Sequence, residues 1–223
     1  MFQKAYFTQL QSKLASYPQA PGLIAVTKYC TLTDIEAAYA AGLRAFGESR
    51  VQDLQAKAAH FATHTPPPRW HFIGHLQRNK LSKVFPVIDC LHSLDSAELA
   101  QNLVDAAAKA AKATPLQVYI QVNLSGQAQK YGFALADLDG IKDCASLIGS
   151  APGLRFAGFM GMSSADASPQ HIRAEFLDLR RLRDSFGFPD LKLSMGMSQD
   201  YELALEAGSD LVRIGSALFK SPG

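Results

Sequence analysis

The sequence lacks most features that mark secreted, membrane-spanning or nucleic-acid-binding proteins. It contains only three cysteines, which lie far apart and form no CxxC pair. No apolar run reaches the roughly 18 residues of a membrane span, and the N-terminal segment has no signal-peptide core. The net charge is only +2, and Lys and Arg form no dense run. These absences predict a cytoplasmic protein with free thiols that binds neither membranes nor nucleic acid.

Short apolar, β-branched runs alternate with amphipathic segments along most of the 223 residues. After an N-terminal helix, the predicted strands are Leu23–Lys28, Arg44–Glu48, Trp70–Gly74, Val87–Leu91, Gln117–Leu124, Arg155–Met160, Lys192–Met195 and Leu211–Ile214. Strands that alternate with helices indicate βαβ units and a parallel sheet. The pattern therefore predicts an α/β fold, with residues 1–223 forming a single (β/α)8 TIM-barrel domain that carries an extra N-terminal helix. An open doubly wound sheet is the alternative, but no GxGxxG motif opens a helix.

The stretch "GLIAVTKYCTLTDIEAA", residues 22–38, places Lys28 where a buried strand ends. A helix is expected to follow, with Thr33 as its N-cap and Glu36 three residues later. Chemistry in such barrels takes place at the C-terminal ends of the strands, so Lys28 is expected at the barrel mouth. There a lysine can pair with an anion, act as a base or form a Schiff base, and partial burial would lower its pKa and favour the neutral amine. A solvated strand-end lysine is the alternative.

Two other strand ends carry groups that suit a phosphate. A helix is expected to begin near Ser198–Asp200 in "KLSMGMSQDYELALEAG", which offers a hydroxyl and backbone N–H groups. The last strand carries Arg213 and is followed by Gly215 and Ser216. Phosphate sites after the seventh and eighth strands are common in these barrels. Plain N-capping at Ser198 and a tight turn at Gly215 and Ser216 are the alternatives.

Several motifs that occur in order along the chain carry a resemblance to a known family. They are "LIAVTK", "AFGESRVQDLQAK", "WHFIGHLQRNK", "LHSLDS", "QVNLSGQAQKYGF", "GFMGMSS", "LSMGMSQD" and "AGSDLVRIGSALF". Together they resemble the YggS/PROSC family of pyridoxal 5′-phosphate-binding homeostasis proteins. The family's barrel is similar to the N-terminal domain of alanine racemase, a fold-type III arrangement.

The resemblance implies specific roles for the residues already noted. It implies that Lys28 forms the internal aldimine with pyridoxal phosphate and that Ser198, Gly215 and Ser216 contact the phosphate. Arg213 would face the pyridine nitrogen. A guanidinium cannot accept a hydrogen bond, so it would hold that nitrogen unprotonated and weaken the cofactor as an electron sink. An ion pair in the barrel interior or at the surface is the alternative for Arg213. One motif departs from the family, because Ser49 stands where FGEN has asparagine, and serine lacks the two N–H donors of the asparagine amide.

The resemblance implies cofactor handling more strongly than catalysis. Alanine racemase uses a second domain and a dimer partner to supply an opposing tyrosine, and this sequence, which ends at Gly223, leaves no residues for such a domain. Tyr29, Tyr131 and Tyr201 could approach the mouth, but nothing in the sequence makes any of them a second base. We therefore expect a monomer that buffers or delivers pyridoxal phosphate, with amino acids and pyridoxal phosphate-dependent apoenzymes as possible partners. A weak racemase or lyase is the alternative function.

The histidines raise the question of a metal site. His60 and His64 are four residues apart at the end of a predicted helix, and His71 and His75 flank a predicted strand with even spacing. No HExxH motif occurs and no cysteine stands at ligand spacing in the sequence. His60 and His64 are expected to be solvated helix-end residues, and His75 could line the mouth. The sequence therefore predicts no metal ligands.

Overall fold

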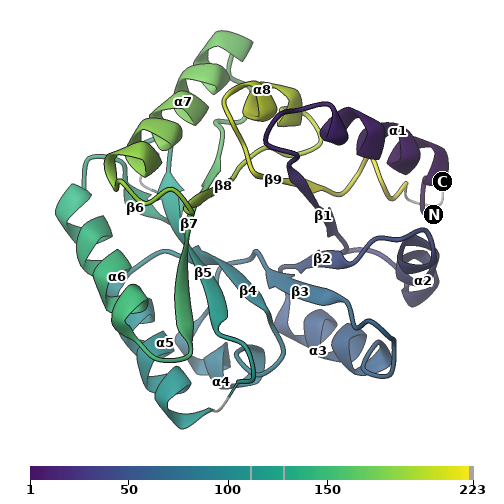
Figure 1. The fold of residues 1–223 in the computed structure, drawn as a ribbon, viewed down its shortest axis with the longest axis horizontal. Coiled ribbons are helices and arrows are strands. Elements are labelled where there is room, and N and C mark those ends of the chain that lie inside the picture. Colours follow the sequence, from purple (N-terminus) through teal and green to yellow (C-terminus); the bar gives the residue numbers. More distant parts are fainter. Residues whose placement is uncertain (111, 128, 221–223) are drawn as a thin grey trace.

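Parallel strands form a closed barrel inside a ring of helices in the computed structural model, which describes residues 1–110, 112–127 and 129–220 (Figure 1). The barrel strands are β1 (Gly22–Val26), β2 (Ala45–Glu48), β3 (Arg69–Phe72), β4 (Cys90–Leu94), β5 (Leu116–Asn123), β7 (Leu154–Met162), β8 (Lys192–Ser194) and β9 (Leu211–Ile214). Each pairs in parallel with its neighbours, and the β1–β9 and β4–β5 pairings complete the closure. The predicted (β/α)8 barrel is confirmed.

Helices follow the strands and cover the outside of the barrel (Figure 1). They are α2 (Leu32–Ala40), α3 (Val51–His60), α4 (Leu81–Val84), α5 (Ala97–Lys109), α6 (Leu138–Ser150), α7 (Pro169–Ser185) and α8 (Tyr201–Glu206), with a 3₁₀ turn η1 (Arg78–Lys80) before α4. The predicted extra N-terminal helix is α1 (Lys4–Ala15), whose buried residues Phe7, Leu10 and Leu14 face the core. None of the helices in the described segments has both the length and the hydrophobicity needed to cross a bilayer.

Specific hydrogen bonds explain two element boundaries that differ from the predicted ones. The N-cap of α2 is Thr31, not Thr33, because the Thr31 hydroxyl accepts a hydrogen bond from the Asp34 amide at 3.2 Å and caps the first turn. Strand β4 begins at Cys90 rather than Val87, because residues 85–87 form a turn and the carbonyls of Phe85, within it, and Ile88, just after it, accept hydrogen bonds from Lys112. The short strand β6 (Phe133–Ala134), which pairs with β5, was not predicted.

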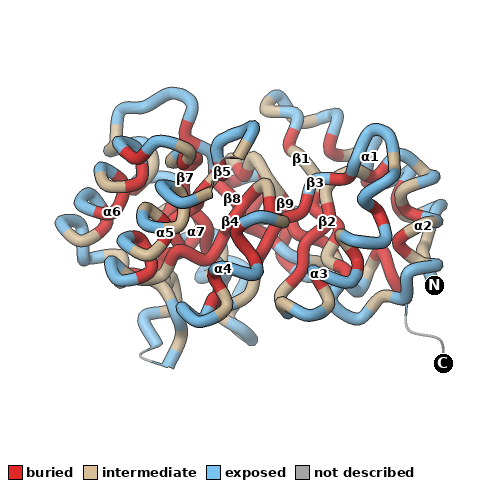
Figure 2. The backbone as a smooth tube through the Cα atoms, turned by 90° about the horizontal axis from the view of Figure 1, so that it is seen from below, coloured by how far each residue is buried: buried red, intermediate tan, exposed pale blue. Residues whose placement is uncertain are grey.

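The buried apolar residues form two clusters, a large one between the barrel wall and the helices and a small one inside the barrel. The large cluster includes outward-facing strand residues such as Phe46, Trp70 and Ile214 together with the inner faces of the helices. Buried segments coincide with the strands at the centre of the molecule (Figure 2). The small cluster contains strand residues only: Cys90, Tyr119, Ala157 and Met160. Alternation along the strands thus leaves the barrel interior with few apolar groups and several polar ones.

Candidate functional site

The predicted site residues lie along one edge of the barrel, at the C-terminal ends of three adjacent strands. Strand β9 pairs with both β1 and β8. Lys28 comes two residues after β1, Gly215 and Ser216 directly follow β9, and Ser198 lies in the turn that follows β8. Because these strands are parallel neighbours, their C-terminal ends form one continuous stretch of the mouth. The tertiary structure therefore brings these residues to one region of the mouth.

Lys28 is exposed at the mouth, so the partial burial expected for its amine is not found. Strand β1 ends at Val26, and Thr27 and Lys28 continue into a loop. The Lys28 ammonium lies 5.3 Å from the centroid of the Tyr29 ring, and the Arg50 guanidinium lies 5.2 Å from the same ring. The tyrosine itself is 75% exposed. Lys28 is thus a cation that solvent, or a ligand entering the mouth, can reach.

A buried ion pair fixes the backbone immediately before Lys28. The Lys57 ammonium, on α3, donates hydrogen bonds to Glu48 Oε1 at 2.6 Å and to the Thr27 carbonyl at 2.7 Å. The Thr27 hydroxyl donates to the same Glu48 oxygen at 2.6 Å. All three residues are buried. Since Thr27 is held from the outer side of the barrel, its neighbour Lys28 is held at the mouth.

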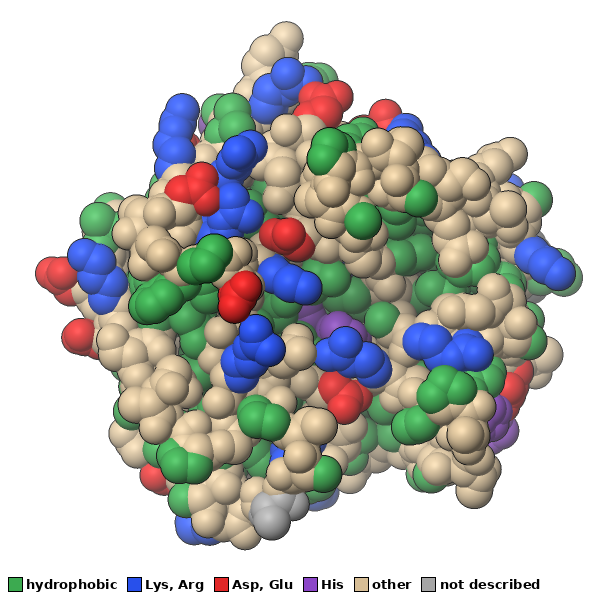
Figure 3. Space-filling model, in the orientation of Figure 1, with side chains coloured by type: hydrophobic (Ala, Val, Ile, Leu, Met, Phe, Trp, Pro, Cys, Tyr) green, Lys and Arg blue, Asp and Glu red, His purple; other side chains and the backbone are tan. Residues whose placement is uncertain are grey.

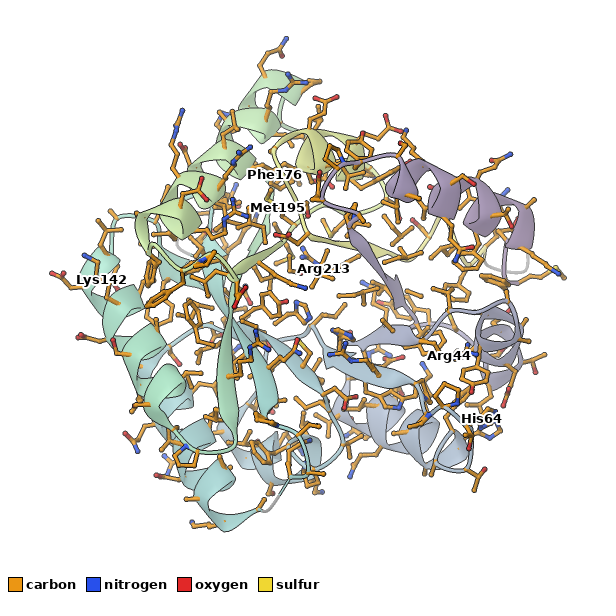
Figure 4. All side chains as sticks on the ribbon, viewed as in Figure 1. Arg44, His64, Lys142, Phe176, Met195 and Arg213 are labelled. Carbon is orange, nitrogen blue, oxygen red and sulfur yellow. The ribbon has the colours of Figure 1, made fainter. Side chains whose placement is uncertain are left out.

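Arg213 projects from β9 into the barrel interior, near the centre of the molecule (Figure 4). Its Nη1 donates to the Ser194 carbonyl at 2.6 Å and to the Ser194 hydroxyl at 2.8 Å, and its Nη2 donates to the Gly161 carbonyl at 2.9 Å. These acceptors are neutral, and no carboxylate in the described residues forms an ion pair with Arg213. Burial lowers its pKa to about 10, although nearby Asp200 acts in the opposite direction. A guanidinium has five N–H donors, so donors remain for a ligand.

Backbone amides after β8 and β9 are available to an anion. Within the described segments, the amides of Ser198, Gln199, Ser216 and Ala217 donate to no protein acceptor. Asp200 shapes the first of these turns, because its carboxylate accepts hydrogen bonds from the Met197 amide and the Ser163 hydroxyl, both at 2.6 Å. The sequence placed Asp200 at a helix start without predicting this role.

Gly215 lies close to the end of β1. A Cβ on Gly215 would lie 3.2 Å from the Val26 Cβ and 3.4 Å from the Val26 carbonyl oxygen. The tip of β9 is therefore packed tightly against β1, and a larger residue would push the two strand ends apart. This contact keeps the amides after β9 close to the segment that carries Lys28.

Sequence reasoning missed a polar chain that continues from Arg213 across the interior. The Ser194 hydroxyl accepts from Arg213 and lies 3.0 Å from His92 Nδ1, so it can donate its own hydrogen there. His92 then carries its proton on Nε2, which lies 2.9 Å from His71 Nδ1 and 3.2 Å from the Cys90 sulfur. His71 carries its proton on Nε2, which has no partner among the described residues.

Burial keeps both histidines of this chain neutral. It lowers the pKa of His71 to about 3. It also lowers the pKa of His92 well below its usual value, and the positive charge of Arg213 acts in the same direction. The Tyr119 ring stacks on His92 with 4.5 Å between centroids. The missed signal was the alternation in "CLHSL", which places Cys90 and His92 on one face of β4.

The other histidines do not join this group. His60 and His64 both bind the Glu36 carboxylate, with Nε2 to oxygen distances of 2.7 and 3.1 Å, and His64 lies near the outside of the molecule (Figure 4). His75 pairs with Asp95 at 2.7 Å and stacks on Tyr131 at 3.8 Å between centroids. The expectation of solvated helix-end histidines therefore overlooked the partners of His60 and His64.

Comparison with known proteins agrees with this architecture. Residues 7–222 match the family described as alanine racemase, N-terminal domain. An alanine racemase from Corynebacterium glutamicum has the same fold with a TM-score of 0.69, at 16% identity, and the match covers 98% of this chain and 60% of that chain. These two findings define the class of protein: an alanine racemase-like barrel.

More similar proteins narrow this class. A protein of Vibrio alginolyticus named pyridoxal phosphate homeostasis protein is 40% identical over 214 residues, which covers 94% of this chain and 90% of the relative. PipY of Synechococcus elongatus, solved with pyridoxal phosphate bound, superposes with a TM-score of 0.84 at 30% identity, covering 97% of this chain and 99% of PipY. The chain therefore belongs to the alanine racemase N-terminal domain family and, within it, to the pyridoxal phosphate homeostasis proteins.

Proposed function

We propose that this protein binds pyridoxal 5′-phosphate at the barrel mouth and takes part in intracellular pyridoxal phosphate homeostasis by buffering or delivering it. The observation that carries the proposal is Arg213, a buried guanidinium with only neutral partners, below a mouth lined by unpaired amides. A buried charge without a counter-charge is costly, so a site of this kind suits an anionic ligand. The names of the relatives and the cofactor in PipY support the same ligand.

Each predicted site residue has a place in this proposal. When bound, pyridoxal phosphate supplies an aldehyde that reacts with a primary amine, and Lys28 offers an exposed amine at the end of β1. The amides around Ser198 and Ser216, with Gly215 packed between strand ends, would bind the phosphate. The unused donors of Arg213 would face the pyridine nitrogen. These groups bind and orient a ligand, and none of them is placed as a base on the opposite side of a substrate.

The organisation of the chain supports three further parts of the proposal. We infer a single cofactor-binding domain over residues 1–223, since the Gln3 amide donates to the Leu218 carbonyl at 2.8 Å and joins the first and last elements. The free thiols of Cys30, Cys90 and Cys144 are consistent with the cytoplasm. A monomer remains our expectation, and sedimentation velocity with and without cofactor tests it. Amino acids and apoenzymes are the proposed partners.

An absorbance titration tests the cofactor site. The purified chain mixed with pyridoxal phosphate should develop the absorbance of a lysine adduct, and borohydride followed by peptide mass mapping should place the cofactor on Lys28. Lys28→Ala should lose the absorbance, whereas Lys80→Ala, which changes a lysine after β3 at the same end of the barrel, should keep it. An adduct on another lysine in the wild-type protein would overturn the assignment of Lys28.

The same samples separate cofactor handling from catalysis. With amino acids added in D₂O, the absorbance should shift without appreciable exchange of the α-proton. Turnover at ordinary enzyme rates of about 1–10³ s⁻¹ that is abolished by Lys28→Ala would instead establish a racemase or lyase.

A further inference from the structure

Three soft or borderline metal-ligand side chains meet inside the barrel, on the side of β3 and β4. His71 pairs in register with Cys90 on the neighbouring strand, and His92 lies two residues after Cys90 on the same face. Their ligand atoms all lie within 4.8 Å of one another. All three side chains are buried, with exposures of 4%, 0% and 0%. No sequence motif predicts this group, because His71 becomes a neighbour of Cys90 and His92 only when β3 and β4 pair.

Two of the three separations between the ligand atoms are slightly shorter than in a metal site, and the third is at most 4.8 Å. His71 Nδ1 and His92 Nε2 are 2.9 Å apart, and the Cys90 sulfur is 3.2 Å from His92 Nε2. A central ion with metal–nitrogen distances of about 2.0–2.1 Å and a metal–sulfur distance of about 2.3 Å separates such atoms by roughly 3.4–3.8 Å. An ion would therefore require His92 Nε2 to move by about half an ångström from each of its two neighbours, with His71 Nδ1 and the Cys90 sulfur, which lie within 4.8 Å of each other, closing on the ion from either side. Met160 packs in the same small cluster as Cys90 and adds a thioether to the surroundings.

Ser194 supplies the orienting contact that metal-bound histidines normally have. His92 Nδ1 lies 3.0 Å from the Ser194 hydroxyl oxygen. When His92 Nε2 binds an ion, the imidazole proton moves to Nδ1 and can be donated to Ser194, which Arg213 already holds in place. Partners of this kind fix the ring orientation and tautomer of ligating histidines. Figure 3 shows histidine atoms near the centre of the visible face, beside Lys and Arg side chains.

Charge selects among the ions that a His₂Cys group can bind. Binding of Cu⁺ to the sulfur releases the thiol proton to solvent, so one positive charge replaces another and the charge of the group is unchanged. Binding of Zn²⁺ with loss of the same proton leaves one extra positive charge in an interior that already holds Arg213. Soft thiolate ligands favour Cu⁺ and Zn²⁺ over harder cations, and the neutral exchange favours Cu⁺. We propose that His71, Cys90 and His92 form a site for Cu⁺ inside the barrel.

Anaerobic metal loading of the cofactor-free, full-length protein tests this proposal. The protein is mixed with Cu⁺ as its acetonitrile complex or, separately, with Zn²⁺, then desalted and assayed for metal. We expect about one copper ion retained per chain and much less zinc. Cys90→Ser should lose most of the copper, whereas Cys144→Ser, which changes a buried thiol on α6 outside the group, should retain it. Far-UV circular dichroism of both variants checks that they are folded.

X-ray absorption at the copper edge of the wild-type protein gives a readout that needs no variant. We expect one sulfur and two nitrogens around the ion. Copper without a sulfur neighbour, or retained equally by Cys90→Ser, would overturn the site. Zinc retained in preference to copper would overturn the selection by charge. Because the protein is cofactor-free throughout, these outcomes do not depend on the proposed binding of pyridoxal phosphate.

Discussion

Two buried cations on opposite sides of the barrel wall, Lys57 and Arg213, differ in the charge of their hydrogen-bond partners. Lys57, outside the barrel wall, is paired with the Glu48 carboxylate at 2.6 Å and also holds the Thr27 carbonyl. Arg213, inside the barrel, has only carbonyl and hydroxyl acceptors in the part of the chain that the structure describes. The charge of Lys57 is therefore neutralised by the protein itself, whereas the charge of Arg213 can be neutralised by a bound anion. The difference separates a structural ion pair from a ligand-binding group.

The largest expected effect is on stability, from breaking the paired cation. Lys57→Met leaves the Glu48 carboxylate buried without its counter-charge, and we expect the free energy of unfolding to fall by about 3–5 kcal/mol. Urea denaturation followed by circular dichroism measures it. The double variant Lys57→Met with Glu48→Leu should recover much of the loss, since removing both charges removes the uncompensated one. Lys57→Met as stable as wild type would show that the Lys57–Glu48 ion pair does not stabilise the fold.

Replacing the unpaired cation should affect ligand binding more than folding. Arg213→Met removes a charge-assisted hydrogen bond worth about 1.5–3 kcal/mol, so we expect pyridoxal phosphate affinity to fall by about 10- to 100-fold. Arg44→Met is the matched control, because Arg44 donates to the Tyr39 and Leu43 carbonyls near the outside of the molecule (Figure 4). Absorbance titration compares the two. An equal loss of affinity in both variants would show that Arg213 contributes no more to ligand binding than a surface arginine.

A smaller effect is expected from the hydroxyl that Arg213 contacts. Ser194→Ala removes one acceptor of Arg213 and the hydrogen-bond partner of His92 Nδ1, and we expect the protein to lose about 1 kcal/mol of stability. Ser93→Ala should be close to neutral, since the buried Ser93 hydroxyl has no partner among the described residues. Thermal unfolding of both variants gives the comparison. Equal changes in the two would mean that the hydroxyl of Ser194 does not stabilise the interior.

The smallest effect concerns a thiol beside the ion pair. Burial raises the pKa of Cys30 from 9.0 to about 12, although the nearby Lys57 acts in the opposite direction. The thiolate is the reactive form, so alkylation by iodoacetamide at pH 8 should be on the order of a thousandfold slower than for an ordinary thiol. The rate should still rise with pH above 10. Peptide mapping of the alkylated protein over a pH series measures this rate, and a plateau near pH 9 would contradict it.

Periodicity predicted the fold because every second residue of the barrel strands is apolar and packs against the outer helices. Trp70, Phe72, Val118 and Ile120 alternate with inward residues and face the helices, so strands and helices could be recognised one at a time. Glycines that end helices, such as Gly42 and Gly208, adopt positive φ as expected for C-terminal caps. The start of β4 was wrong because contacts with Lys112, from another segment, hold the residues before it. The start of α2 was wrong because Thr31, not the nearby Thr33, accepts the capping hydrogen bond from the Asp34 amide.

The site was only partly predictable, for a related reason. Lys28, Ser198, Gly215 and Ser216 stand at strand ends, where topology alone brings them together. The chain from Arg213 through Ser194 to His92 and His71 depends on which side chains meet across the barrel, and Asp200 on the shape of one turn. The amino-acid sequence alone does not indicate which of the many possible side-chain contacts across the barrel form.

By itself, the sequence determined a barrel of alternating strands and helices, with an amine at the end of the first strand, because hydrophobic burial follows local periodicity. Only the tertiary structure decided that Glu48 neutralises Lys57 while Arg213 stays uncompensated, and that His71, Cys90 and His92 share one small space. Closing the sheet on itself brings residues distant in the chain within hydrogen-bond distance, and electrostatic energies depend on that distance.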